Sequence, residues 1–313
     1  QVINKRFLFK ILKMDFNTIL EQMAVLFTVV IAGYISGKCK LMDQTLSKKL
    51  SALIINLTCP CLIIASTMGD KMPERSLIVP LLIVSTLTYV ILLCIASYLP
   101  KWFGVKKEEE GIYSFMLAFG NVGFIGYPVV SSIFGPEAVF YASVLNVANT
   151  FCVFVWGAQF IAGKDEEHFH WNRLISPAMI GTYISIIIVA ISLPTPQVLS
   201  RPFILIGNIT VPGSLLIIGY SISQIPSRKM AGSPRIFLMA VLRLIILPLF
   251  VMTIFKTINV FDDKIVNINT MIIAMPVASF GTMLCFKLGK DETIMAQGTF
   301  ITTLLSVLTI PIV

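Results

Sequence analysis

The stretch GIYSFMLAFGNVGFIGYPVVSSIF, residues 111–134, decides the fold: it is long and apolar enough to cross a membrane, yet it is interrupted at its centre. Gly120, Gly123 and Gly126 crowd the middle of this stretch, and Pro128 follows them. Proline removes a backbone donor and glycine adds backbone freedom, so we expect the helix to unwind here. Lipid cannot satisfy the backbone groups freed by unwinding, so the interruption must face protein or a water-filled cavity.

The composition excludes a soluble protein. The chain has 313 residues, of which 56% are hydrophobic and 13% charged, and its mean hydropathy is +0.88. Soluble domains carry about 25% charged residues, so lipid must surround most of this chain. The net charge of +8 is scattered over short loops, which argues against a nucleic-acid partner. Most of the six cysteines lie in apolar runs and form no disulfide framework.

A spanning helix needs about 20 mostly apolar residues. On this basis the sequence predicts an all-α polytopic membrane protein with ten spanning helices, at 17–37, 46–69, 76–99, 111–134, 138–162, 174–193, 202–225, 234–255, 266–286 and 292–312. Met14 resembles a natural start, so residues 1–13 are expected to be a disordered or non-native head, without a signal-peptide cleavage pattern. Residues 14–163 then hold the first five spans, 164–173 form a cytoplasmic linker, and 174–313 hold the second five.

The distribution of Lys and Arg orients these spans. Loops after odd-numbered spans hold fourteen basic residues: Lys38, Lys40, Lys48, Lys49, Lys101, Lys106, Lys107, Lys164, Arg173, Arg228, Lys229, Arg235, Lys287 and Lys290. Apart from the head, the opposite side holds five: Lys71, Arg75, Arg201, Lys256 and Lys264. The positive-inside rule therefore predicts an integral protein of the cell membrane whose two termini both lie outside the cytoplasm.

The sequence repeats itself at an offset of about five spans. Residues 56–60 (NLTCP) match 208–212 (NITVP), and 127–129 (YPV) match 275–277 (MPV). Gly135, Glu137 and Ala142 likewise parallel Gly289, Asp291 and Ala296. Because five is an odd number of spans, the two halves must cross the membrane in opposite directions. Inverted repeats of this kind are typical of secondary transporters.

A second interrupted span lies at 269–286 (NTMIIAMPVASFGTMLCF), where Pro276 and Gly281 take the place of Pro128 and the glycines. Paired interruptions in corresponding spans indicate a binding site, because the half-helix starts expose N–H groups that suit a carboxylate. The predicted substrate-binding residues are Asn121, Gly123, Asn146, Asn149, Ser279, Thr282 and Gln297, and the predicted helix-break residues are Gly126, Pro128, Pro276 and Gly281. The alternative for these small and polar residues is helix–helix packing.

Arg243 is the one charged residue in the core of a predicted span. It is expected either to attract an anion or to serve a structural role, for example by snorkelling to the cytoplasmic end of its helix. No Asp, Glu or His lies at the centre of a predicted span, so the sequence offers no evident proton carrier. Uniport or export driven by the membrane potential, or coupling to Na⁺ or H⁺, remain open.

Two further segments invite a metal-binding interpretation. Residues 59–61 (CPC) resemble a soft-metal motif, but the matching positions 211–213 read VPG. Residues 165–170 (DEEHFH) carry acids and histidines that could bind a divalent ion, yet a solvated polar loop explains them far better. We therefore expect neither a metal site nor a resident cofactor.

The chain resembles the auxin efflux carrier family, whose bacterial members include malonate and malate permeases and whose plant relatives are the PIN-FORMED auxin exporters. The resemblance rests on FGNVGFIGYP (119–128), AMPVASFGTMLCFKLGKD (274–291) and the ending TLLSVLTIPIV (303–313). It extends over all ten predicted spans. Asn121 matches the crossover asparagine of the family, Pro128 and Pro276 its crossover prolines, and Asn146 a position where the plant exporters carry a substrate-contacting glutamine.

This resemblance implies a fold like those of sodium/proton antiporters and bile-acid symporters, with two inverted five-helix repeats and crossing broken helices 4 and 9. It also implies a scaffold of spans 1, 2, 6 and 7, homodimers formed through that scaffold, and a transport unit of spans 3–5 and 8–10 that moves like an elevator. The long loop, the acid–lysine pair and the aromatic pocket of the plant exporters are absent here. A small organic anion is therefore a better substrate than auxin.

These features favour a non-enzymatic carrier that exports a small organic anion, either as a uniporter or as a secondary-active transporter. An enzyme would need a nucleophile with a base, or a metal cluster, within the membrane. The alternatives that remain are an anion channel and a non-transporting membrane receptor or sensor.

Overall fold

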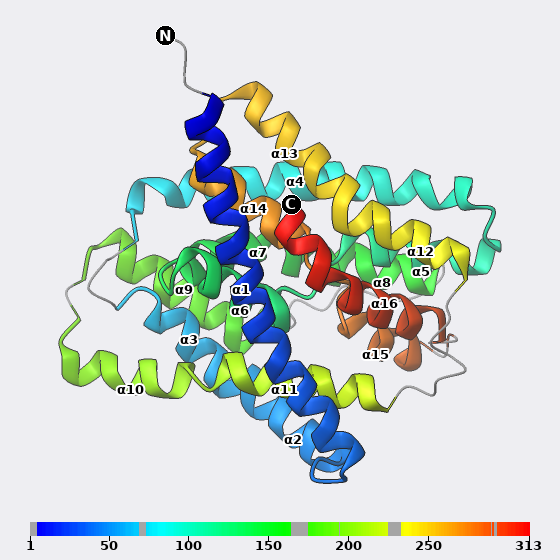
Figure 1. Ribbon diagram of the computed structural model, residues 1–313, viewed down its shortest axis with the longest axis horizontal. Coiled ribbons are helices and arrows are strands. Elements are labelled where there is room, and N and C mark those ends of the chain that lie inside the picture. Colours follow the sequence, from blue (N-terminus) through cyan, green and yellow to red (C-terminus); the bar gives the residue numbers. More distant parts are fainter. Residues whose placement is uncertain are drawn as a thin grey trace.

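The computed structural model describes residues 5–68, 73–163, 175–193, 195–224, 233–288, 290 and 293–313, with the side chains of 5–19, 154, 283, 286 and 287 left aside. The regular elements within these ranges are all helical (Figure 1). In the first half they are α1 (Lys5–Lys38), α2 (Gln44–Leu53), η1 (Ile54–Thr58), α3 (Cys59–Ala65), η2 (Arg75–Leu77), α4 (Ile78–Tyr98), η3 (Leu99–Phe103), α5 (Lys107–Ala118), η4 (Val122–Gly126), α6 (Tyr127–Phe134), α7 (Ala138–Cys152), η5 (Val153–Gly157) and α8 (Ala158–Ala162).

The second half continues with helices of similar length. They are α9 (Pro177–Ala190), α10 (Gln197–Gly207), α11 (Thr210–Ser223), α12 (Pro234–Val241), η8 (Leu242–Ile246), α13 (Leu247–Ile258), α14 (Asp263–Ile273), α15 (Phe280–Lys287), α16 (Thr293–Thr309) and η9 (Ile310–Ile312). Helix α1 starts at Lys5, so the helix runs through the part of the predicted head that the structure describes.

Within the described residues, seven helical segments are long and apolar enough to cross a membrane. They are Leu20–Lys38, Gln44–Ala65, Arg75–Phe103, Ala138–Ala162, Gln197–Ser223, Pro234–Ile258 and Thr293–Ile312. The other three predicted spans coincide with α5–α6, α9 and α14–α15, each of which is either short or interrupted. The structure therefore bears out an all-helical polytopic membrane protein.

Several prolines widen a helix instead of breaking it. Pro60, Pro128 and Pro248 each lie in the first turn of a helix that continues directly from a five-residue π-helical turn, η1, η4 or η8 respectively. A proline clashes with the carbonyl four residues earlier and cannot donate to it, and a π turn relieves both problems. Pro128 thus follows a widened turn, and the interruption of its span lies elsewhere.

The helices sort into two packed groups. The first group contains α1, α2–α3, α9 and α10–α11: α1 packs along α11, and α3 packs against α9 and α10. The second group contains α4, α5–α6, α7–α8, α12–α13, α14–α15 and α16, with α4 against α5, α7 and α14, and α12 against α16. In Figure 1, α10 and α11 run across the lower part of the molecule and α4 across the upper part. The groups meet where α1 contacts α6, α11 contacts η4, and α9 contacts α7.

Two glycines let α1 and α11 approach backbone to backbone. A Cβ atom on Gly33 would lie 2.3 Å from the carbonyl oxygen of Leu216, and one on Gly219 would lie 2.0 Å from that of Val30. The hydrophobic effect cannot drive helices together inside lipid, so helices there are held by the close packing that small residues allow. The first group is therefore held by close helix packing.

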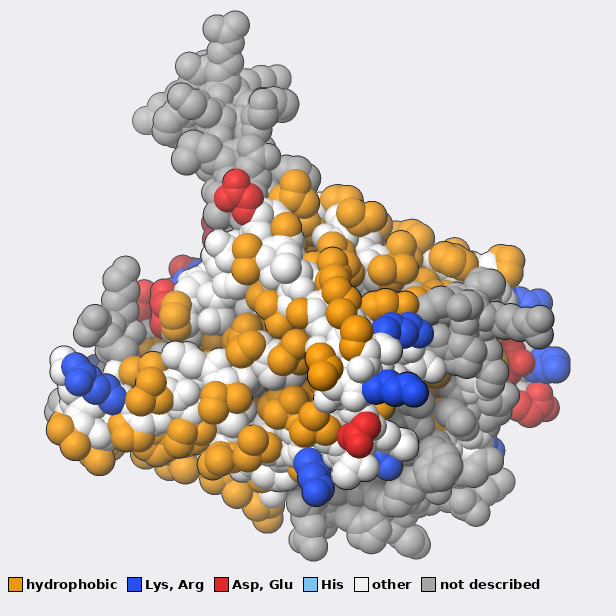
Figure 2. All heavy atoms as spheres, turned by 60° about the horizontal axis from the view of Figure 1, so that its bottom comes forward, with side chains coloured by type: hydrophobic (Ala, Val, Ile, Leu, Met, Phe, Trp, Pro, Cys, Tyr) orange, Lys and Arg blue, Asp and Glu red, His pale blue; other side chains and the backbone are white. Residues whose placement is uncertain are grey.

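The outer surface is apolar over wide areas. Large apolar side chains such as Val198 (83% exposed) and Leu205 (70% exposed) on α10 project from it. Figure 2 shows a broad apolar face with Lys, Arg, Asp and Glu gathered at its margins. Exposure of such a surface is unfavourable in water and favourable in the hydrocarbon of a bilayer.

Candidate substrate site at the helix crossing

Two interrupted segments cross at the centre of the second group and satisfy each other's backbone. Helix α5 ends at Ala118, Phe119 is extended, and Gly120 forms an isolated antiparallel bridge with Val277, which lies between α14 and α15. The Asn121 N–H donates to the Pro276 carbonyl at 2.7 Å, and the Ala278 N–H donates to the Phe119 carbonyl at 3.1 Å. Such pairing meets the demand that buried backbone groups find partners. We call Phe119–Asn121 and Met275–Ala278 the crossing.

The two half-helices that leave the crossing begin with polar side chains in mutual contact. Asn121 caps η4, because its Oδ1 accepts from the Phe124 N–H at 3.3 Å, and its Nδ2 donates to Ser279 Oγ at 3.0 Å. Ser279 directly precedes α15. Helix starts carry a partial positive charge of about half a unit. The crossing thus brings two such starts, each with a polar cap, to one place.

Arg243 serves the two helix ends that enter the crossing. It is fully buried, and its Nη1 donates to the Leu117 carbonyl at 2.8 Å while its Nε donates to the Met275 carbonyl at 3.3 Å. These carbonyls lie at the ends of α5 and α14, where the helix dipole is negative, so a cation is stabilising there. Snorkelling to the membrane surface is excluded by this burial, and the structural role is the one that the contacts support.

Gly120 makes room for that arginine. A Cβ atom at this position would lie 2.3 Å from Arg243 Nη2 and 3.3 Å from the Met275 carbonyl oxygen. Gly123, by contrast, has no heavy atom within 4 Å of the place a Cβ would take. The glycine-rich motif therefore contains one residue required for close packing and one that is not.

A cavity of about 710 Å³ opens beside the crossing, between the two groups of helices. The first group contributes polar side chains from α2–η1 and α11, and the second contributes the crossing, α15 and α16. Its lining residues are Ser47, Lys48, Ser51, Ala52, Ile55, Asn56, Asn121, Phe124, Ile217, Ile218, Ser221, Ile222, Ser279, Thr282, Ala296, Thr299, Phe300 and Thr303. Lys48 is the one charged residue among these lining residues, and amides and hydroxyls supply the other polar side-chain groups.

The structure brings together only some of the residues predicted to bind substrate. Asn121, Ser279 and Thr282 line the cavity, whereas Gly123, Asn146, Asn149 and Gln297 are not among the residues that line it. Asn146 and Asn149 form a separate polar chain on α7. In it, Asn149 Nδ2 donates to Asn146 Oδ1 at 2.7 Å and Asn146 Nδ2 donates to the Tyr127 hydroxyl at 3.2 Å.

The predicted helix-break residues also fall into different roles. Pro276 lies in the interruption itself, between α14 and α15. Pro128 and Gly126 lie on the far side of the break, seven and five positions beyond Asn121, where η4 passes into α6. Gly281 is packed in α15, since a Cβ there would lie 2.5 Å from Phe115 Cε1. The repeat match makes Pro128 equivalent to Pro276, and the two segments contact each other through Gly120 and Val277.

Other lining residues were not predicted. Ser47 and Ser51 on α2 are four positions apart, as are Thr299 and Thr303 on α16. This spacing puts each pair on one helix face, and it was a usable signal in otherwise apolar spans. From the sequence, Lys48 is predicted only as one of the basic loop residues that orient the chain in the membrane.

The repeat positions Thr58 and Thr210 are buried at another contact, where the Thr210 hydroxyl donates to the Thr58 hydroxyl at 2.9 Å. Gly289 and Asp291, of the third repeat match, lie outside the described residues.

Comparison with known proteins assigns the chain to a family. The profile of the family described as "Membrane transport protein" matches residues 18–170 and 166–313. An uncharacterized transporter of Methanocaldococcus jannaschii is 25% identical over 307 residues, covering 93% of this chain and 96% of the relative. A second uncharacterized transporter, from Methanothermobacter thermautotrophicus, is 22% identical over 294 residues, with the same coverage. The chain belongs to the membrane transport protein family, that of the auxin efflux carriers which its crossing motifs resemble.

Proposed function

We propose that the protein is a carrier for small organic anions such as malonate or malate, and that it binds its substrate in the cavity beside the crossing. The observation that carries this proposal is the contact of Asn121 with Ser279, which joins the starts of two half-helices at the cavity wall. Backbone N–H groups at helix starts, amides and hydroxyls are suited to a carboxylate. Lys48 adds a positive charge among the lining residues.

The place of the cavity between the two helix groups supports alternating access. In this proposal the first group is the scaffold, spans 1, 2, 6 and 7, and the second is a transport unit that moves past it like an elevator. The Thr58–Thr210 contact supports the division of the chain into two inverted repeats of five spans, because it pairs positions that the repeat makes equivalent. In this proposal the protein forms homodimers through the scaffold, as the family resemblance implies.

The residues around the cavity support export as the direction of transport. Ser47, Lys48 and Ser51 belong to the start of span 2, on the side where the basic residues concentrate. By the positive-inside rule that side is cytoplasmic, with both termini outside, and the cavity accepts anions from within the cell. A membrane potential of 100 mV contributes about 2.3 kcal/mol per charge to anion export. Among the described residues no carboxylate or imidazole lines the cavity, so the transport is uniport or is coupled to Na⁺ held by neutral oxygens.

Flux in proteoliposomes tests the proposal. Vesicles preloaded with unlabelled malonate or malate should take up the labelled anion by counterflow, and the initial rate should saturate with concentration. Asn121→Ala should remove most of this uptake, whereas Asn208→Ala should retain it, because Asn208 is exposed and does not line the cavity. Flux without saturation, together with unitary current steps, would identify a channel. Binding without any flux would identify a receptor.

A further inference from the structure

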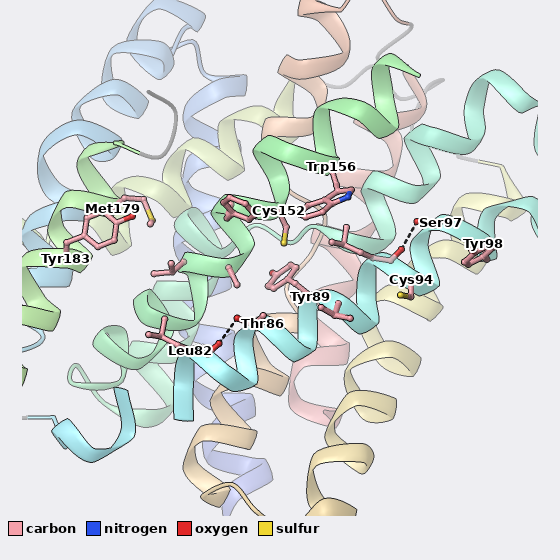
Figure 3. A pocket seen from close by; sticks show the side chains of 15 residues that line it. Leu82, Thr86, Tyr89, Cys94, Ser97, Tyr98, Cys152, Trp156, Met179 and Tyr183 are labelled. Atoms are coloured by element: carbon pink, nitrogen blue, oxygen red, sulfur yellow. Dashed lines mark hydrogen bonds between the residues drawn. The ribbon is translucent and has the colours of Figure 1, made fainter. Parts of the chain in front are cut away.

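A second cavity, of about 740 Å³, runs along α4 between α7, η5 and α9 (Figure 3). Its lining residues are Leu82, Thr86, Tyr89, Val90, Leu93, Cys94, Ser97, Tyr98, Val147, Ala148, Phe151, Cys152, Trp156, Met179 and Tyr183. None of these residues lines the cavity at the crossing. We call this cavity the α4 groove.

The chemistry of the α4 groove suits an apolar occupant. The Thr86 hydroxyl donates to the Leu82 carbonyl at 2.8 Å and the Ser97 hydroxyl donates to the Leu93 carbonyl at 2.7 Å, so these hydroxyls are satisfied within α4 (Figure 3). Aromatic and aliphatic side chains make up most of the remaining lining. Cavities lined by apolar groups hold water poorly. The groove therefore favours hydrocarbon over water or a polar solute.

The groove is open at its outer rim. Tyr89 and Cys152 are buried at its base, whereas Val90 is 53% exposed and Trp156 38% exposed. Along α4 the lining residues run from Leu82 to Tyr98, about 24 Å at the helical rise. One leaflet of a bilayer offers about 15 Å of hydrocarbon. The groove is thus long enough for an acyl chain that lies in it at a slant.

A positive charge marks one end of the α4 groove. The Lys101 ammonium lies 5.2 Å from the centre of the Tyr98 ring, and Trp102 beside it is 87% exposed. Tryptophan and tyrosine gather where hydrocarbon meets headgroups. Lys106 and Lys107 are exposed in the same connection, together with Glu108 in the first turn of α5. Lys101 has no ion pair with any described residue, so it is available to an anionic headgroup.

We propose that the α4 groove binds one acyl chain of an anionic phospholipid whose headgroup contacts Lys101. The length, the apolar lining and the cation at the interfacial end together select this occupant over a soluble ligand. The bound chain contacts both helix groups, because Met179 and Tyr183 belong to α9 in the first group while the other lining residues belong to the second. Occupancy therefore favours the arrangement of the two groups seen in this structure.

Quenching of Trp156 fluorescence tests this site. The chain has three tryptophans, so a variant with Trp102→Phe and Trp171→Phe reports on Trp156 alone. In nanodiscs, phosphatidylglycerol brominated on an acyl chain should quench Trp156 with about fivefold higher apparent affinity than brominated phosphatidylcholine. One lysine near an anionic headgroup contributes about 1 kcal/mol, which corresponds to this factor.

Matched variants distinguish a specific lipid-binding site from general exposure to lipid. Lys101→Gln should remove the preference for phosphatidylglycerol, whereas Lys256→Gln, at an exposed lysine in the last turn of α13, should keep it. Ala148→Phe should fill the groove and lower the quenching by both lipids; the lysine pair decides the matter if that variant does not fold. Equal quenching by the two lipids in the parent protein, or a preference that survives Lys101→Gln, would overturn the proposal.

Discussion

The two segments that meet at the crossing reach the same arrangement with different residues. In α5–η4–α6 the interruption is Phe119–Asn121, it contains a glycine, and the proline comes later, inside a helix. In α14–α15 the interruption contains Pro276 itself. Each segment satisfies the backbone of the other through Gly120 and Val277 and their neighbours. Mutual pairing of backbone groups is therefore common to the two interruptions, whereas a proline lies in only one of them.

The segments also differ in what caps them. Asn121 uses its amide to cap its own half-helix and to reach Ser279, whereas Ser279 accepts from it with a shorter side chain. Arg243 is shared, since it binds one carbonyl from each segment. Substitution of Arg243 therefore tests the contact that the two segments share, whereas substitution of Asn121 tests the cap of one segment.

Removal of the shared arginine should have the largest effect. Arg243→Met leaves the Leu117 and Met275 carbonyls without their charged donor, and hydrogen bonds to charged groups contribute about 1.5–3 kcal/mol each. Relief of the buried charge offsets part of this loss, so we expect destabilisation by about 3 kcal/mol. Thermal unfolding in detergent, followed by intrinsic fluorescence, measures it. Arg235→Met is the control, because Arg235 is exposed; equal stability of the two variants would contradict the shared role of Arg243.

The next effect distinguishes two glycines of one motif. Gly120→Ala should destabilise the protein by about 1–3 kcal/mol, because its Cβ would collide with Arg243 Nη2. Gly123→Ala meets open space in a helical turn, so it should be neutral or stabilise by up to about 1 kcal/mol. The same unfolding assay compares the two. If both variants lose stability to the same extent, the close approach of Arg243 to Gly120 is not the reason for a glycine at position 120.

The prolines should give the smallest effect and the sharpest contrast. Pro128→Ala removes only a restriction on the unfolded chain and should cost less than about 1 kcal/mol, with anion binding unchanged. Pro276→Ala frees the backbone next to the carbonyl that Asn121 contacts, and anion binding should weaken. Thermal-shift titration with malonate measures both. A larger loss of anion binding in Pro128→Ala than in Pro276→Ala would contradict this account, because it would indicate that Pro128 causes the interruption of the first segment.

The sequence predicted the helical membrane architecture because hydrophobic runs of spanning length need no tertiary information. The crossing was predicted as a pair of interrupted spans, but its register was not. The match of Pro128 with Pro276 rests on residue identity, whereas the register is set by contacts between Gly120 and Val277, which are distant in sequence. The π turns before Pro60, Pro128 and Pro248 likewise show that a helix can accommodate a proline without being interrupted.

The candidate site was predicted in part for a similar reason. Asn121, Ser279 and Thr282 flank the interruptions, so local sequence marks them. Lys48, Ser51 and Thr303 come to the cavity only because α2 and α16 pack beside the crossing. Asn146 and Asn149 carry the right chemistry, yet in the described structure they pair with each other and with Tyr127 instead of lining the cavity. The arrangement of helices, which periodicity does not encode, decides among such residues.

Anion-dependent thermal stabilisation of Asn121→Ala tests the central claim most directly. A ligand at one hundred times its Kd stabilises a native protein by about 2.7 kcal/mol, so a bound dicarboxylate should raise the unfolding temperature of the parent protein measurably. Asn208→Ala, the exposed control, should show the same rise. In Asn121→Ala the rise should disappear, because the cap of one half-helix and its link to Ser279 are both lost. An equal rise in all three proteins would place the anion elsewhere and contradict a substrate site at the crossing.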